Sequence, residues 1–277
     1  MTKIYRYCFN NGETAIIDFL YQQNITCEKT EIMTTFELSE SNIHFHSVYE
    51  YLLRHNIEPI SIEVSFSRKE IEEAEWLSVR STWRLGYPQP QHDMQYRNTT
   101  YDSSDFCEEC GNGLVQRDNF IFKKEPNWGT RNFFMTNWVH DELFISEKAV
   151  SILQDSGVSG FFYNDVLNPS RRIMGKVKQI YIKNYLSKGL HYNSIKKEIL
   201  CPKCNSKKFI LSPGFIEYDK KVFSNVEFDI LKTKEKFGEI TCISLIIITQ
   251  KLYKTLCEHK LDRGLVFTPI KLIVSVK

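Results

Sequence analysis

Two pairs of cysteines constrain the fold of this chain more than any other feature. Cys107 and Cys110 lie in FCEECGNG, and Cys201 and Cys204 lie in LCPKCNSK. The CxxC spacing lets one tight turn present two thiolates to the same ion, and four thiolates complete a tetrahedral structural zinc site. We therefore predict one structural Zn²⁺ held by these four residues. Two unrelated thiol pairs or a redox CxxC are the alternative, although a redox motif does not account for the second pair.

This metal site argues against zinc hydrolysis, because four thiolates leave no open position for a water molecule. The chain contains no P-loop, GxGxxG, GxSxG or HExxH motif. The run His140-Asp141-Glu142 could form an acid–base cluster, but charged neighbours after a strand usually form an exposed turn. His44 and His46 fall in an expected helix, where such positions point about 200° apart, so we assign them no metal. We predict a protein that is not an enzyme.

The composition is that of a globular protein, with 277 residues of which 42% are hydrophobic. The longest apolar run is far shorter than the roughly 20 residues that a membrane helix needs, and the N-terminus lacks a secretion signal. CxxC pairs suit a reducing compartment. We expect a cytoplasmic protein with no membrane partner.

The pattern of apolar residues predicts an α+β protein in two parts. Residues 1–85 are expected to form an acidic α/β domain, and residues 86–277 a duplicated domain that carries both CxxC pairs. We place the boundary in the segment GYPQPQHDMQ, which is rich in proline and has no apolar periodicity. The elements expected in the first part are strands at 3–9, 26–38, 60–66 and 77–85 and helices at 13–23, 41–56 and 68–76. Ser39 or Ser41 is expected to cap the second helix, with Ile43 on its apolar face.

A repeat follows each cysteine pair. LFISEKAVSILQDSGVSGFFYNDV begins at Leu143, and IIITQKLYKTLCEHKLDRGLVFTPI begins at Ile246. Ser146 and Thr249 occupy matching N-cap positions, and a glycine that ends the helix occurs in each copy. We therefore predict that each copy forms a strand, a capped helix, a glycine turn and a strand, with one cysteine pair per copy.

Charge is unevenly distributed along the chain. Residues 28–75 contain eleven Glu against four basic residues, and residues 171–208 contain eleven Lys and Arg against Glu198 alone. This asymmetry favours docking of the two halves or a charged partner, and two solvated faces are the alternative. Lysines interleaved with tyrosines in the basic stretch could bind nucleic acid, or could form the solvent face of an edge strand.

The chain resembles the bacterial double-CXXCG proteins, some of which are immunity proteins that protect a cell from a neighbour's toxin. The resemblance rests on CEECG at 107–111, CPKC at 201–204, EPNWG at 125–129, NWVHDELFIS at 137–146 and the copy from Ile246. It covers residues 80–277 and implies a toxin as the protein partner. Asn205 departs from the pattern, which has glycine there, so we expect the turn after the second pair to differ. Nucleic acid is the alternative partner.

Overall fold

The computed structural model describes residues 1–274 and divides the chain into two compact units, Met1–Glu70 and Ile71–Lys277. The division falls earlier than the proline-containing segment in which we expected it. The reason is the strand β5 (Trp76–Ser81), which forms ladders with two strands from the end of the chain. Residues 71–85 therefore belong to the second unit.

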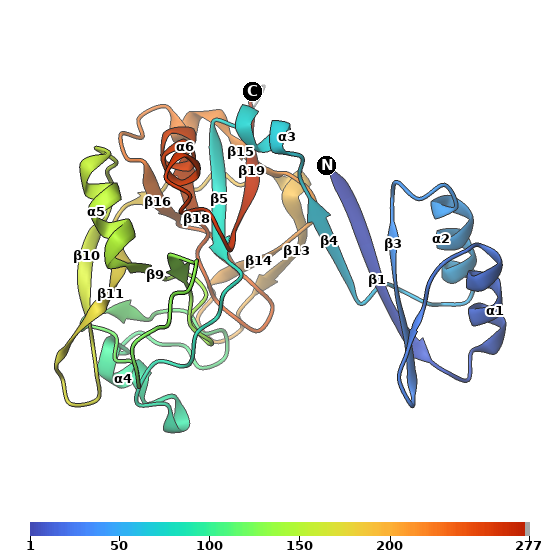
Figure 1. Cartoon of the computed structure of the whole chain (residues 1–277), viewed down its shortest axis with the longest axis horizontal. Helices are drawn as coiled ribbons and strands as arrows, with labels where there is room; N and C mark the ends of the chain where they lie inside the picture. Colours follow the sequence, from blue (N-terminus) through green and yellow to red (C-terminus); the bar gives the residue numbers. More distant parts are fainter. Residues whose placement is uncertain (275–277) are drawn as a thin grey trace. The chain divides into compact units, whose positions relative to one another are not determined.

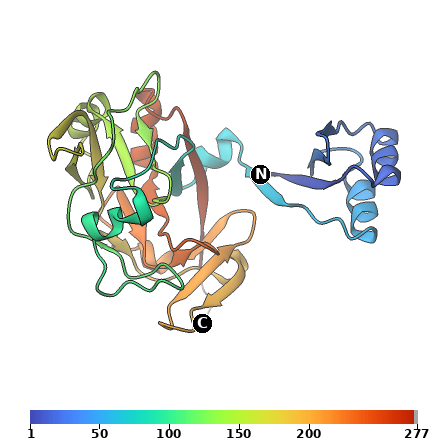
Figure 2. The same cartoon turned by 90° about the horizontal axis from the view of Figure 1, so that it is seen from below.

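The first unit is a four-stranded antiparallel sheet with two helices on one face (Figure 1; Figure 2). Its strand order, β2-β3-β1-β4, is that of two interleaved β-α-β units, as in ferredoxin-like folds. Alternate residues of β1 and β3 face the helices and build a core around Tyr7, Phe36 and Leu38. The elements are β1 (Thr2–Asn10), α1 (Thr14–Gln22), β2 (Glu28–Lys29), β3 (Met33–Ser39), α2 (Phe45–Arg54) and β4 (Ser61–Ser65). The short helix α3 (Arg68–Glu73) contains the division between the two units.

The predicted start of α2 was wrong. The helix begins at Phe45 without a side-chain cap, and the Asn42 side chain instead accepts a bond from the His44 backbone N–H in the preceding turn. Ile43 lies outside the helix and is 91% exposed. Ser39 and Ser41 bond to each other rather than to the helix.

The second unit is built from a four-stranded sheet, β10-β11-β9-β8, a six-stranded sheet, β12-β16-β18-β5-β19-β15, and two smaller sheets, β13-β14-β17 and β6-β7. Three short 3-10 turns also occur. The elements before the second cysteine pair are η1 (His92–Met94), α4 (Tyr96–Thr100), β6 (Tyr101–Asp102), β7 (Val115–Gln116), β8 (Phe133–Phe134), β9 (Leu143–Ser146), α5 (Glu147–Asp155), β10 (Phe162–Leu167), β11 (Ile173–Tyr181), β12 (Tyr185–Leu186), η2 (Tyr192–Ser194) and β13 (Ile195–Leu200). Those after it are β14 (Lys207–Leu211), β15 (Ile216–Asp219), η3 (Lys220–Phe223), β16 (Ile230–Thr233), β17 (Lys236–Phe237), β18 (Ile246–Thr249), α6 (Gln250–Glu258) and β19 (Leu265–Ile273).

The two segments that we predicted to be copies of one unit have the same topology. In the first, β9 and β10 flank β11 and are antiparallel to it, and β8 pairs with the other edge of β9. In the second, β18 and β19 flank β5 in the same way, and β16 pairs with the other edge of β18. In both sheets the strand between the two flanking strands lies outside the copy that supplies them. β5, which precedes the first cysteine pair, lies between β18 and β19 of the second copy. β11, which precedes the second cysteine pair, lies between β9 and β10 of the first copy.

The helix caps match between the copies as well. The Ser146 hydroxyl accepts a bond from the Ala149 N–H and donates to the Asn132 side chain at 2.8 Å. The Thr249 hydroxyl accepts from the Leu252 N–H and donates to the Asp229 carboxylate at 2.8 Å. Asn132 immediately precedes β8 and Asp229 immediately precedes β16, the strands that pair with β9 and β18. The predicted strand, capped helix and strand are therefore present in both copies.

One hydrophobic core lies between the two copies and receives matching residues from each. Ile145 and Ile248 point into it from β9 and β18, and Leu153 and Leu256 from the two helices; all four are at most 3% exposed. Strands such as β9 and β18 are apolar along nearly their whole length because both faces of their sheets are covered. Among residues 1–274, no helix has the length and apolar character needed to cross a membrane.

Candidate metal centre

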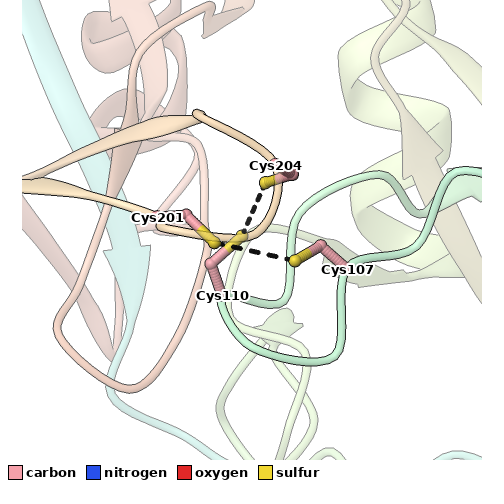
Figure 3. Close-up of side chains that lie close together, drawn as sticks. All are labelled: Cys107, Cys110, Cys201 and Cys204. Carbon is pink, nitrogen blue, oxygen red and sulfur yellow. Dashed lines mark hydrogen bonds between the residues drawn. The ribbon is translucent and has the colours of Figure 1, made fainter.

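The four predicted ligands come together at the contact of two loops (Figure 3). Their sulfur atoms lie within 4.8 Å of one another, with 3.7 Å between Cys107 and Cys201 and 3.5 Å between Cys110 and Cys204. Disulfide sulfurs lie about 2 Å apart, whereas Zn–S bonds of about 2.3 Å in a tetrahedron separate the sulfurs by about 3.8 Å. The spacing therefore fits a tetrahedral metal ion.

The two loops, which we call knuckles (107–112 and 201–206), have the same backbone hydrogen bonds. In the first, the Cys107 N–H donates to the Asn112 carbonyl at 2.8 Å and the Gly111 N–H to the Cys107 carbonyl at 2.8 Å. In the second, the Cys201 N–H donates to the Ser206 carbonyl at 2.9 Å and the Asn205 N–H to the Cys201 carbonyl at 3.0 Å.

The expectation that Asn205 alters the second turn was wrong. Gly111 has a φ of 77° and Asn205 has a φ of 56°, so both occupy the left-handed region. Asparagine adopts this region more readily than most side chains, which lets it replace glycine here. The Asn112 side chain also donates to the Ser206 hydroxyl at 2.9 Å, which joins one knuckle directly to the other.

In each knuckle the sulfur of the second cysteine accepts a hydrogen bond from a backbone N–H. The backbone N–H of Asn112 bonds to the Cys110 sulfur, and that of Ser206 bonds to the Cys204 sulfur. Burial nevertheless raises the pKa of the Cys110 thiol to about 12, whereas the Ser206 hydroxyl and N–H lower the pKa of the exposed Cys204 thiol to about 6. Cys110 is therefore a thiol without a metal, and metal binding at this position releases its proton.

Lys208 provides an independent indication that this cluster carries negative charge. Its side chain is buried, with the residue 3% exposed, and among residues 1–274 its ammonium donates only to three backbone carbonyls, those of Cys110, Glu239 and Thr241, at 3.0–3.3 Å. A buried ammonium needs a nearby negative charge to offset its lost hydration. Four thiolates around a divalent ion would carry a net charge of about −2 and would supply it.

Among residues 1–274, these four cysteines form the one group of three or more His, Cys, Asp or Glu side chains with metal-binding geometry. His44 and His46 are not part of such a group. The structure thus brings together all four predicted ligands, and the donor set of soft thiolates fits zinc.

The run His140-Asp141-Glu142 is not the exposed turn that we expected. Glu142 is 6% exposed and forms an ion pair with Lys232 of β16. Burial raises the pKa of Glu142, and burial together with Arg84 lowers that of His140. Burial opposes the charge of Lys232, but the carboxylates of Glu142 and Asp141 raise its pKa, so it is protonated at neutral pH. The sequence signal for this pair was Lys232 itself, because a lysine within the strand sequence DILKT indicates a buried position that needs an acidic partner.

Four of the eleven basic residues in the stretch 171–208 form ion pairs with carboxylates. Arg171 pairs with Asp118, Lys178 with Asp165, Lys197 with Glu239 and Lys207 with Glu198. Lys208 is buried, and Lys183 lies over the rings of Phe162 and Tyr181. The stretch therefore presents less free positive charge than its sequence indicates.

Comparison with known proteins adds no identification. A scan against protein-family models finds no match for the chain, and a search of curated proteins finds none either.

Proposed function

We propose that this chain is a non-enzymatic binding protein whose second unit is stabilised by one structural zinc ion. The observation that carries the proposal is the convergence of Cys107, Cys110, Cys201 and Cys204 on one point. Four thiolates fill a tetrahedral shell, so the ion holds the two knuckles together and offers no position to a substrate.

We further propose that the bound partner is a bacterial toxin and that the chain acts as an immunity protein in the cytoplasm. This rests on the resemblance to double-CXXCG proteins. It is supported by the matching knuckles, in which Asn205 takes the left-handed conformation of Gly111. The acidic charge of residues 28–75 favours a partner with a basic surface, because complementary charge accelerates association.

The test is a competition between bacterial strains. A strain that lacks the gene is mixed with its unmodified parent and is expected to be killed by it. The wild-type gene and a Cys8→Ser variant, which keeps the metal site, should restore survival, whereas Cys204→Ser should not. Survival of the deletion strain beside its parent would refute the immunity role.

Nucleic acid is the less well supported partner. Binding to phosphates requires free Lys and Arg side chains that release counterions. Arg171, Lys178, Lys197 and Lys207 each already pair with a carboxylate, which reduces the positive potential of the stretch. The proposed partner is therefore a protein.

We also propose that the second unit arose by duplication of one segment that begins with a strand and contains one knuckle. The ladder registers support this, because Ile180 faces Tyr163 in the first copy as Val79 faces Phe267 in the second. Under this proposal, each repeat places its first strand, β5 or β11, in the sheet of the other. Such an exchange makes each copy depend on the other for its core.

A further inference from the structure

A cavity of about 450 Å³ lies beside the first knuckle. Its walls come from four parts of the second unit: α4 with the following strand, the knuckle and its continuation to Gln116, the segment 138–142, and the residues around β12 and β17. Its volume lies within the range of about 300 to 1,000 Å³ that is typical of small-molecule sites.

The ion pair of Glu142 and Lys232 forms part of the cavity wall. Glu142 also accepts a bond from the Gln179 side chain at 3.0 Å, and Gln179 exchanges bonds with Gln116 at 2.7 and 2.8 Å. Apolar residues of similar volume usually stabilise a fold as well as a buried ion pair does. A charged pair in a cavity wall therefore favours a role in binding.

Positive groups outnumber negative groups around the cavity. Arg97, Lys183, Lys232 and Lys236 contribute cations, against the carboxylates of Asp141 and Glu142. Asp141 is engaged by the backbone N–H of Ser244 at 3.2 Å. Glu142 offsets the charge of Lys232, so the excess of cations that attracts an anion comes from Arg97, Lys183 and Lys236.

Two buried polar atoms on the cavity residues have no hydrogen-bond partner within the described part of the chain. They are Nε of Arg97 and Nδ1 of His140. Nε of Arg97 is a donor, and a buried donor left without an acceptor costs about 1–3 kcal/mol, so this atom indicates where an acceptor belongs. Nδ1 of His140 donates or accepts according to the tautomer of the ring. Aromatic rings, including those of Tyr96 and Trp138, complete the walls and provide an apolar surface.

We propose that this cavity binds a small organic anion in which a carboxylate or phosphate group is attached to a flat ring. The oxyanion accepts bonds from Arg97 and from the ammonium groups of Lys183 and Lys236, and the ring packs among the aromatic side chains. The proposal is independent of toxin binding, because it concerns a site for a small molecule within the second unit.

The test uses three matched probes: phenyl phosphate, benzoate and benzyl alcohol. Binding to the zinc-loaded full chain is measured by ligand-observed NMR and calorimetry at millimolar probe concentration. We expect at least one anion to bind about tenfold more tightly than the neutral alcohol, and the tighter anion identifies the head group. Arg97→Gln and Lys183→Gln should each weaken the binding of that anion by about tenfold.

Lys254→Gln is the matched control, because this lysine is exposed on α6 and does not line the cavity. Zinc content and thermal unfolding establish that each variant is folded, and Lys183→Gln, an exposed position, keeps the test decisive if Arg97→Gln is unstable. Three results would each overturn the proposal: no binding of either anion, equal binding of the alcohol, or equal weakening by Lys254→Gln.

Discussion

Replacing Glu142 by Gln should destabilise the second unit strongly while keeping the side-chain volume. The side chains of Glu142 and Lys232 are 8% and 6% exposed, and the substitution leaves the ammonium buried without its main carboxylate. Breaking a buried pair costs about 3–5 kcal/mol. Since Asp141 also stabilises the charge of Lys232, we expect the lower end, about 3 kcal/mol.

Urea unfolding followed by tryptophan fluorescence measures this loss, because all four tryptophans lie after residue 75 and report on the second unit. The double variant Glu142→Gln/Lys232→Met removes both charges and should recover at least half of the loss. The exposed pair Lys197–Glu239 is the control, and its neutralisation should cost less than about 1 kcal/mol. A loss below about 1 kcal/mol for Glu142→Gln, or no recovery in the double variant, would refute this reasoning.

Three further outcomes are expected. Gly160→Ala should lower the free energy of unfolding by at least about 1 kcal/mol more than Gly264→Ala does. Both glycines have positive φ, but a Cβ at Gly160 would lie 2.5 Å from the Ile230 carbonyl oxygen. Equal losses for the two variants in urea titrations would contradict this expectation. Acidification to about pH 5 should release zinc, since the raised pKa of Cys110 makes protons strong competitors, and an indicator dye that detects no release would count against it. Gel shifts at physiological salt should show no binding of an unrelated oligonucleotide, and salt-sensitive micromolar binding would reverse our choice of partner.

The features that could be predicted from the sequence are those set by local spacing. CxxC spacing determines that two thiolates share a turn, and a hydroxyl followed by helical periodicity predicts the caps at Ser146 and Thr249. These signals remain valid whatever surrounds them. The starts of both repeat helices were therefore predicted correctly, and the four cysteines meet as expected.

The features that could not be predicted depend on partners distant in the sequence. Nothing within WLSVRS indicates that β5 pairs with β18 and β19, so the domain boundary was placed too late. Likewise, the sequence DILKT indicates that Lys232 is buried, but it does not indicate that Glu142, in the segment before β9, is its partner. Burial and pairing of such residues follow from sheet order, which local pattern does not encode.

The measurement that tests the central claim most directly is the metal content and coordination of the purified chain. Elemental analysis is expected to give one zinc per chain, and X-ray absorption at the zinc edge should show four sulfur ligands at about 2.3 Å. Replacement of Cys107, Cys110, Cys201 or Cys204 by Ser should each remove the metal and unfold the second unit. A chain free of zinc that keeps its native fold, or a zinc ion with nitrogen or oxygen ligands, would contradict the account.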